Sequence, residues 1–298
     1  MLLKKRIELS GHSAAIYTID GIDNFIYTGS GDTYVAKWNL LKGTQEKFSI
    51  KTDSSVYKIK LLISNKILAI GTLKGSLHLI DLLNKKEIKH FKQHQSAIFE
   101  IQENPSKNQF YTTDANGNLA IWDLKTYELL IFIPLESGKI RRILTSEDGK
   151  YIYLACQNGE IKKFDTTHFN EINYFVAHES SVNCLNFHPT KKKTLISGGK
   201  DGFIKFWNLD NNNKLILEIP AHNFAIYQLD FFNENSYFVT ISRDKSIKIW
   251  DTNTLKVLQK IERKHGGHSH SINAFWKKLE SEFVTIGDDK RIIYWELE

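Results

Sequence analysis

Short runs in which apolar and polar residues alternate recur along the whole chain. In one of them Ile204 and Phe206 alternate with Phe203 and Lys205, and Ile247 and Ile249 show the same alternation with their polar neighbours. A period of two residues indicates β-strands with one buried face, and turn-forming residues separate the runs. Helical periodicity is hard to find anywhere. The pattern therefore predicts an all-β protein built from short strands.

The strands belong to a repeat. A bulky residue followed by Asp, Asn or Glu returns at spacings of 42, 42, 42, 43, 43 and 45 residues. These anchor residues are Trp38, Ile80, Trp122, Phe164, Trp207, Trp250 and Trp295. A period in this range is typical of repeat architectures in which each repeat is one supersecondary unit. Seven anchors span the chain, so the prediction is seven units of about four strands each.

Two further marks accompany the anchors. Six residues before each anchor stands a turn position, occupied by Asp32, Lys74, Asn116, Asn158, Asp201, Asp244 and Asp289. Gly follows it in four repeats, and Asn-Gly and Asp-Gly are strong hairpin signals because both residues tolerate positive φ. Five repeats begin with a histidine, at His12, His94, His178, His222 and His268. An apolar residue follows about four positions later, and Val56 and Ile140 hold that place in repeats two and four.

The histidine, the turn aspartate and the Trp-Asp ending resemble the WD40-repeat family across essentially the whole chain. That resemblance implies one domain over residues 1–298, a seven-bladed β-propeller whose blades are four-stranded antiparallel sheets. Residues 2–9 precede the first histidine, while the last repeat ends just after its Trp. We therefore expect residues 2–9 to form the outer strand of blade seven and to close the ring.

The resemblance also implies that the repeated polar residues are structural rather than catalytic. In this family the histidine, the turn aspartate, a Ser or Thr of the second strand and the Trp form a buried network within each blade. Complete sets are expected in blades one, five, six and seven: His12, Asp32 and Trp38; His178, Asp201 and Trp207; His222, Asp244 and Trp250; His268, Asp289 and Trp295. Blade three has Asn116 in place of the acid. Blades two and four lack most of the set, and we hypothesise that they are locally less stable.

Composition adds few constraints. The net charge is +6, from 40 basic and 34 acidic residues, and the basic residues are dispersed rather than gathered into a stripe, so nucleic acid is not the favoured partner. Cys156 and Cys184 are the two cysteines, which favours buried free thiols over disulfides. No apolar run suits a signal peptide or a membrane span. We expect a cytoplasmic protein that does not insert into a membrane.

The residues that could carry chemistry have simpler interpretations. The run His265-Gly-Gly-His268-Ser-His270 lacks the spacing of a metal site and is read as a loop, and Lys191–Lys193 as a solvated turn. Neither a phosphate-binding glycine loop nor a nucleophile elbow is present. The sequence therefore predicts no metal, no cofactor and no enzymatic activity.

Function is expected where the repeats differ. The residue after the first apolar position of each repeat should point to one face of the propeller: Tyr17, Tyr57, Phe99, Arg141, Asn183, Tyr227 and Asn273. Aromatic residues and Arg are enriched at interaction hot spots, and Arg243 and Lys200 would add positive charge beside them. These aromatics either bind a partner or pack against neighbouring blades. The leading prediction is a non-catalytic scaffold, a monomer or a subunit of a hetero-complex, that binds a protein or peptide. The alternatives are an enzyme with a site in the central channel and a binder of nucleic acid or phospho-ligands through Arg141, Lys200 and Arg243.

Overall fold

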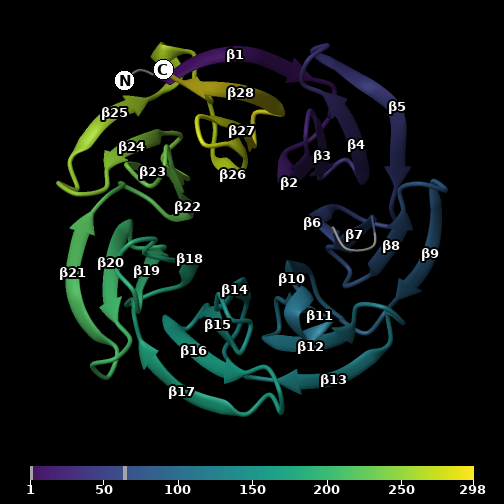
Figure 1. Cartoon of the computed structure of the whole chain (residues 1–298). Helices are drawn as coiled ribbons and strands as arrows, with labels where there is room; N and C mark the ends of the chain where they lie inside the picture. Colours follow the sequence, from purple (N-terminus) through teal and green to yellow (C-terminus); the bar gives the residue numbers. More distant parts are fainter. Residues whose placement is uncertain (1–2, 63–65) are drawn as a thin grey trace.

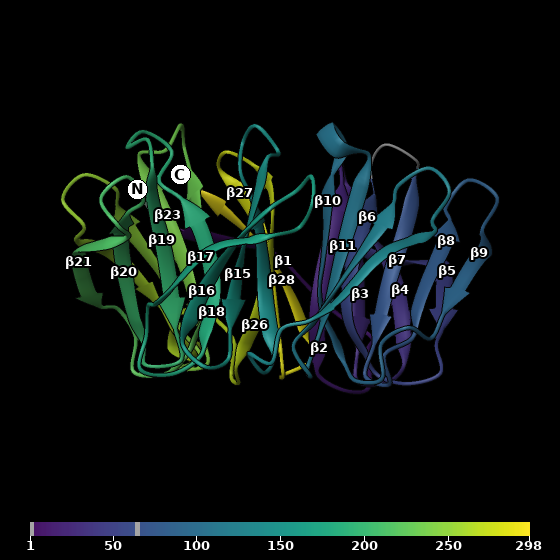
Figure 2. The ribbon, with the colours of Figure 1, turned by 90° about the horizontal axis from the view of Figure 1, so that it is seen from below.

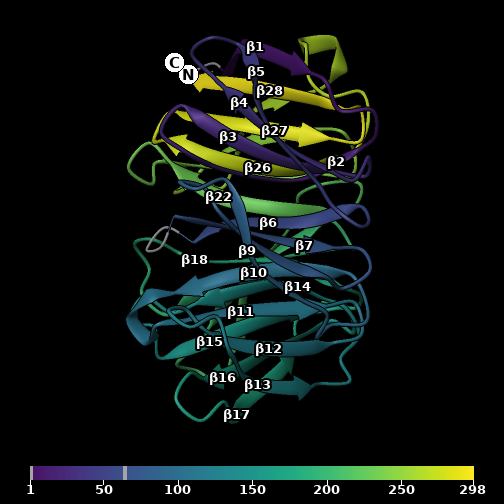
Figure 3. The same ribbon diagram turned by 90° about the vertical axis from the view of Figure 1, so that its right-hand side faces the viewer.

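Seven antiparallel sheets stand around a common axis in the computed structural model, which describes residues 3–62 and 66–298. Each sheet contains four strands. The side views in Figures 2 and 3 show the strands crossing the thickness of the ring, with loops at both ends. No α-helix occurs in the described ranges, and two single 3-10 turns, η2 (Pro105–Lys107) and η3 (Arg263–His265), lie in loops. The predicted seven-bladed propeller is confirmed.

Within each blade the strands follow chain order from the axis to the rim (Figure 1). Blades one to three are β2 (Ile16–Ile22), β3 (Phe25–Ser30), β4 (Tyr34–Asn39) and β5 (Thr44–Lys51); β6 (Val56–Leu62), β7 (Ile67–Thr72), β8 (Leu77–Asp81) and β9 (Lys86–Phe91); β10 (Ile98–Asn104), β11 (Gln109–Asp114), β12 (Asn118–Asp123) and β13 (Leu129–Pro134).

The next three blades repeat this order. They are β14 (Ile140–Thr145), β15 (Tyr151–Cys156), β16 (Glu160–Asp165) and β17 (Glu171–Val176); β18 (Val182–Phe187), β19 (Thr194–Gly199), β20 (Phe203–Asn208) and β21 (Lys214–Pro220); β22 (Ile226–Phe232), β23 (Tyr237–Ser242), β24 (Ile247–Asp251) and β25 (Val257–Ile261).

Blade seven combines the two ends of the chain. Its inner strands are β26 (Ile272–Leu279), β27 (Glu282–Gly287) and β28 (Arg291–Leu297), and its outer strand is β1 (Leu3–Ser10). β1 pairs antiparallel with β28, from Leu3 opposite Leu297 to Ser10 opposite Arg291, and Figure 1 shows it at the rim beside β28. The predicted closure of the ring is confirmed, although residue 2 of the predicted strand lies outside the described ranges.

The turn between the second and third strands has the same backbone conformation in all seven blades. Its third residue has positive φ throughout: Thr33, Gly75, Gly117, Gly159, Gly202, Lys245 and Lys290. At Gly202 a Cβ would lie 2.2 Å from the carbonyl oxygen of His222, which begins blade six. The missing side chain therefore lets the turn of one blade pack directly against the entry loop of the next.

The hydrophobic core lies between adjacent blades. One cluster joins Val35 of blade one to Val56 and Ile70 of blade two, all fully buried, and the other interfaces are built alike. The outer strands carry more exposed residues, as in β9, where five of the six residues are exposed. Burial of both faces of the inner strands explains their apolar content, and the half-solvated rim explains the polar residues there.

Candidate functional site

The mouth of the central channel is built by a repeated β-bulge. The first residue of every innermost strand is an aliphatic side chain with no exposed surface: Ile16, Val56, Ile98, Ile140, Val182, Ile226 and Ile272. The register with the second strand shifts immediately after it in all seven blades. The residue skipped by the shift is the variable position singled out in the sequence. Because a bulge redirects a side chain, this residue leaves the sheet's regular alternation at the channel mouth.

Three of the redirected side chains form a row of aromatic rings. The Tyr17 and Tyr57 rings stack at 4.8 Å between centroids, and Phe99 meets Tyr57 edge to face at 5.3 Å. All three residues are half-buried. The row is therefore partly exposed and also packs ring against ring across neighbouring blades, while its role in binding a partner stays a prediction.

Arg141 ends this row and connects it with the far side of the mouth. Its guanidinium carbon lies 5.2 Å from the Phe99 ring centroid and 6.0 Å from that of Tyr227 in blade six. Lys139 also lies over Phe99, at 4.5 Å. Both geometries are within cation–π range. We define Tyr17, Tyr57, Phe99, Lys139 and Arg141 as the mouth cluster, of which Lys139 was not anticipated from the sequence.

Burial removes water from Arg141 and so strengthens its attraction for an anionic group. Burial lowers the pKa of Arg141, and the electrostatic influence of Tyr227 and Tyr57 opposes this shift. Burial likewise lowers the pKa of Lys139, and the charge of Arg141 lowers it further. The guanidinium nevertheless stays charged at neutral pH. Two adjacent cations that have lost hydration attract an anionic group.

The other predicted face residues differ in their roles. Tyr227 and Asn273 are half-buried and Arg243 is exposed, and all three line the channel. Asn273 donates to the carbonyl oxygen of Ile16 at 2.8 Å, which ties blade seven to blade one. Asn183 is buried. Lys200 is exposed but is not among the residues that line the channel, so it does not join Arg243 there.

The channel, with its mouth included, has a volume of about 670 Å³ and charged walls. Buried Glu100 pairs with Lys58 at 2.7 Å and Arg142 at 3.3 Å, which come from the blades on either side. Burial lowers the pKa of Lys58, and the charge of Glu100 opposes this shift. This triad joins three blades around the axis.

The channel differs from the sequence prediction in one respect. Repeat alignment indicated no gathering of carboxylates, yet Asp20, Glu100 and Asp230 all line the channel. Asp20 and Asp230 share one repeat position, four residues after the first apolar residue of the inner strand, and Glu100 stands two residues after it. The alignment missed them because it compared only the residue directly after that apolar residue. Each is engaged: Asp20 accepts from the Leu61 amide at 2.8 Å, and Asp230 accepts from the Phe231 amide at 2.8 Å. Burial raises the pKa of Asp230.

The predicted polar networks have the same geometry in each complete blade. In blade one the Trp38 indole N–H lies 2.7 Å from Thr28 Oγ1, which lies 2.8 Å from His12 Nε2. His12 Nδ1 lies 2.8 Å from Asp32. Blades five, six and seven repeat these contacts, with Ser197, Thr240 and Thr285 as the central hydroxyls. Each donor thus has an acceptor when the imidazole is neutral, with its proton on Nδ1.

Blade three corrects the expectation that it lacks the acid. His94 Nδ1 lies 2.8 Å from Asp114, two residues before Asn116, and His94 Nε2 lies 2.7 Å from Thr112. Asp114 has no exposed surface and also accepts from the Asn118 side chain. The end of the second strand lies close enough to the turn to provide the same carboxylate. A search of the turn position alone could not find it.

The remaining candidates lie apart from the mouth. Cys156 and Cys184 are buried free thiols, and burial raises the pKa of Cys184 to about 12. Lys191–Lys193 connect β18 to β19 and are exposed at the opposite end of the strands. In the loop after η3, His268 belongs to the blade seven network, while His270 is exposed. No helix in the described ranges is long and apolar enough to cross a bilayer.

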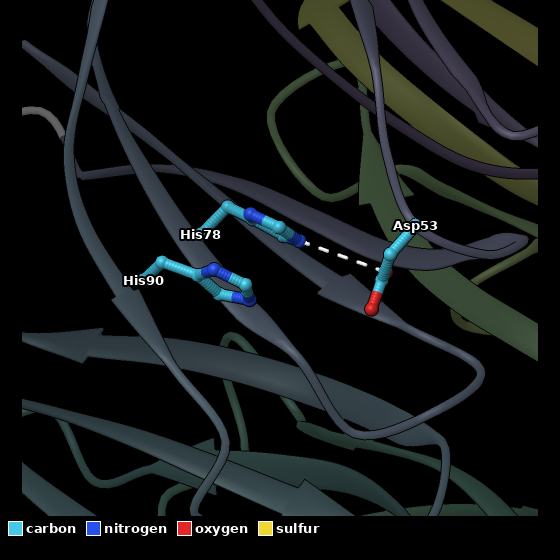
Figure 4. A group of neighbouring side chains, drawn as sticks. All are labelled: Asp53, His78 and His90. Carbon is cyan, nitrogen blue, oxygen red and sulfur yellow. Dashed lines mark ion pairs between the residues drawn. The ribbon is translucent and has the colours of Figure 1, made fainter.

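One constellation escaped the sequence entirely. Asp53, in the loop between β5 and β6, and His78 and His90 of blade two offer ligand atoms that all lie within 4.8 Å of one another. Figure 4 draws the three side chains. Their separations of 25 and 12 residues match no metal-site spacing. His78 and His90 come together because β8 and β9 pair them directly opposite each other.

Known proteins match this chain both in the repeat itself and over much of its length. The model "WD domain, G-beta repeat" matches residues 169–208 and 213–251. "Polyadenylation factor subunit 2" of Candida albicans is 29% identical over 63% of this chain and 31% of its own length. "WD repeat-containing protein 55 homolog" of Dictyostelium discoideum is 23% identical over 84% of the chain and 60% of its length. "Telomerase protein component 1" of mouse is 25% identical over 74% of the chain and 8% of its length.

These matches extend well beyond the two repeats that the family model covers. The chain spans between 8% and 60% of the length of these three relatives. The matched repeats are blades five and six, where the network residues are complete. The seven-bladed ring, the repeated network and these similarities agree, and they confirm the resemblance to the WD40-repeat family that the sequence indicated.

Proposed function

We propose that this protein is a non-catalytic scaffold that binds a protein segment carrying an acidic group at the mouth of its channel. The observation that carries the proposal is the mouth cluster, in which an aromatic row ends on Arg141. Neither Arg141 nor Lys139 forms an ion pair with any residue in the described ranges. A carboxylate brought by a partner would pair with the guanidinium while its neighbouring side chains cover the rings.

The charge of the channel supports an acidic ligand. Seven basic side chains line it: Lys58, Lys60, Lys139, Arg141, Arg142, Arg243 and Lys277. Four acidic side chains line it: Asp20, Glu100, Asp230 and Asp288. A concave surface with an excess of one sign focuses its field and attracts the opposite charge. The excess cations lie at the mouth, since Glu100 already pairs with Lys58 and Arg142 deeper in the channel.

The engaged carboxylates favour binding over catalysis. A general acid or base needs reach to a substrate, whereas Glu100 is 1% exposed and held by two cations. Relatives named as a subunit of a polyadenylation factor and as a component of telomerase support a role as one part of a larger assembly. Cytoplasmic residence stays a prediction.

Charge removal at Arg141 tests the proposal. The immobilised chain is used to capture proteins from extracts of its source cells, in parallel with Arg141→Gln and with Lys192→Gln on the opposite face. Partners retained by the wild type and by Lys192→Gln should be lost with Arg141→Gln. Loss of these partners by competition with a poly-glutamate peptide would confirm that an acidic group is recognised. Equal capture by all three proteins would refute the proposal.

Replacement of two aromatic residues provides a second test, in which a loss of thermal stability is also expected. Tyr57 lies between Tyr17 and Phe99, so Tyr57→Ala with Phe99→Ala removes both ring contacts, each worth about 1 kcal/mol beyond area burial. We expect a fall of several degrees in Tm together with loss of capture. Nuclease-sensitive capture that falls steeply with salt would instead identify the alternative nucleic-acid ligand.

A further inference from the structure

The side chains of blade two form an unusual arrangement around His78. This residue is 8% exposed and lies on β8, facing a groove of about 450 Å³ beside β5 of blade one. Its Nδ1 lies 2.6 Å from Glu87 Oε1, so the ring donates from Nδ1 to that carboxylate. A neutral imidazole then presents its lone pair at Nε2.

The lone pair at Nε2 has no ordinary partner. In the five network histidines this atom lies within hydrogen-bonding distance of a Ser or Thr hydroxyl, as His12 does with Thr28. In His78 the same atom is buried and has no hydrogen-bond partner in the described part of the chain. It faces Asp53 Oδ1 at 3.7 Å, shown by the dashed line in Figure 4. The lone pair of the buried His78 nitrogen thus faces an oxygen of the exposed Asp53 carboxylate, and a cation placed between the two atoms would satisfy both.

The dimensions suit a divalent transition metal. With metal–ligand bonds of about 2.0–2.1 Å, two ligands of a tetrahedral zinc ion lie about 3.3 Å apart, close to the separation of His78 Nε2 and Asp53 Oδ1. His90 provides a third ligand atom within 4.8 Å of both. Its ring stacks on that of His78 at 4.2 Å, and because His90 is exposed, its side chain can rotate toward the metal.

The surroundings supply the support that a metal-binding histidine usually has. Hydrogen bonding of the second ring nitrogen to a carboxylate fixes the tautomer and raises the basicity of the ligand, and Glu87 holds this position for His78. Asp53 is oriented by Ser76, whose hydroxyl donates to the other carboxylate oxygen at 2.7 Å. The adjoining groove leaves space for a water molecule as the fourth ligand.

We propose that Asp53, His78 and His90 form a binding site for a divalent transition metal of the zinc class on blade two. Two imidazole nitrogens, one carboxylate oxygen and one water make up the ligand set of the ion. The site joins the loop between β5 and β6 to the paired strands β8 and β9. Bound metal would therefore link blade two to the connection from blade one, where the His-Asp-Trp network is missing.

Zinc chloride titrated into the EDTA-treated full chain tests the proposal by calorimetry and by thermal melting. We expect one high-affinity ion per chain and a rise in Tm. Asp53→Asn and His90→Ala should each weaken zinc binding at least tenfold and abolish the rise in Tm. His168→Ala is the control, because its side chain is 77% exposed on a loop of blade four. It should bind zinc as the wild type does.

Two results would overturn the proposal. One is zinc binding that is equal in the wild type, Asp53→Asn and His90→Ala, which would place the ion on other histidines. The other is an imidazolium between Asp53 and Glu87, visible by nitrogen NMR as a His78 ring protonated on both nitrogens at pH 7 and unchanged by zinc. Cooperative melting of each variant without metal establishes that a loss of binding does not come from unfolding.

Discussion

At the scale of single residues, the polar networks show how a histidine can be buried without the free-energy cost of unsatisfied hydrogen-bonding groups. The indole, hydroxyl, imidazole and carboxylate of a blade form one hydrogen-bonded chain, so no buried donor lacks an acceptor. Burial disfavours ionisation of Asp289, but the hydrogen bond from His268 and those from the Ser269 and Arg291 amides outweigh it, and the pKa of Asp289 falls to about 2. The Asp289 carboxylate is therefore charged in the folded protein at neutral pH and acts as the acceptor at the end of the network.

Blade three offers the sharpest test of this idea. Asp114→Ala removes the fully buried carboxylate that accepts from His94, and leaving the imidazole N–H unpaired should cost roughly 2–4 kcal/mol of unfolding free energy. Asn116→Ala, at the exposed turn position, should change stability by less than about 0.5 kcal/mol. Urea unfolding of both variants measures the difference. A larger loss of stability in Asn116→Ala than in Asp114→Ala would show that the turn residue, and not Asp114, is the partner of His94.

At the scale of elements, the inner strands and the closing strand contribute different things. The bulge that begins each inner strand determines which side chains reach the mouth, while the aliphatic residue before it stays fully buried. The closing strand β1 is held by its pairing with β28, by buried Leu3 and Leu9, and by ion pairs along its exposed side. Arg291 donates two hydrogen bonds to Glu8, at 2.7 and 2.6 Å, in a bidentate arrangement.

Ring closure should therefore weaken in acid. The hydrogen bond from Arg291 lowers the pKa of Glu8 to about 2, below the value near 4.5 that it has when unpaired. A lowered pKa means that the contribution is complete above about pH 4.5 and is lost as pH falls toward 2. Limited proteolysis at the N-terminus, with an acid-active protease, should accelerate across this range. Glu8→Gln should already show the faster cleavage at pH 5.

The size of this effect is limited by solvent. Glu8 and Arg291 are partly exposed, at 37% and 22%, so the pair should contribute no more than about 1 kcal/mol. Glu147→Gln, which alters an exposed acid on the loop between β14 and β15, serves as the matched control. Identical acid sensitivity in Glu8→Gln and the wild type would exclude Glu8 as the titrating group.

At the scale of the whole molecule, two blades are built by a different rule from the others. Where five blades carry Ser or Thr between the histidine and the Trp, blades two and four carry Ile70 and Leu154, both fully buried. Their anchors are Ile80 and Phe164 instead of Trp. Because the hydroxyl and the indole are replaced together, no indole N–H is left without its acceptor, and such paired replacement is often nearly neutral in free energy.

Amide hydrogen exchange would measure the consequence. The hypothesis that blades two and four are less stable stays a prediction, and the coordinated replacement limits its size. We expect β7 and β15 to exchange only a few-fold faster than β19 and β23. A difference above roughly 100-fold, equivalent to about 2.7 kcal/mol, would show that the polar network dominates blade stability. Slower exchange in β7 and β15 would contradict the hypothesis.

The sequence by itself determined the architecture, because the same pattern of strands and turns recurs seven times at a period of about 43 residues. Strand alternation, turn residues and the Trp anchors agree in most copies, so degenerate copies such as blade two could be placed by their spacing alone. The same reasoning identified Tyr17, Tyr57, Phe99 and Arg141, since these positions are where the copies differ. For blade three it chose Asn116, because the repeat marked only the turn.

Tertiary structure alone decided what those side chains do. The bulge redirects Arg141, and ring closure brings it near Tyr227, which lies 86 residues away in the chain and two blades further round. Pairing of β8 with β9 placed His78 opposite His90, and the loop before β6 added Asp53. Such contacts depend on register and on the curvature of the ring, which no local pattern encodes. The repeat therefore predicted where the strands lie, while the closed ring determined which residues meet.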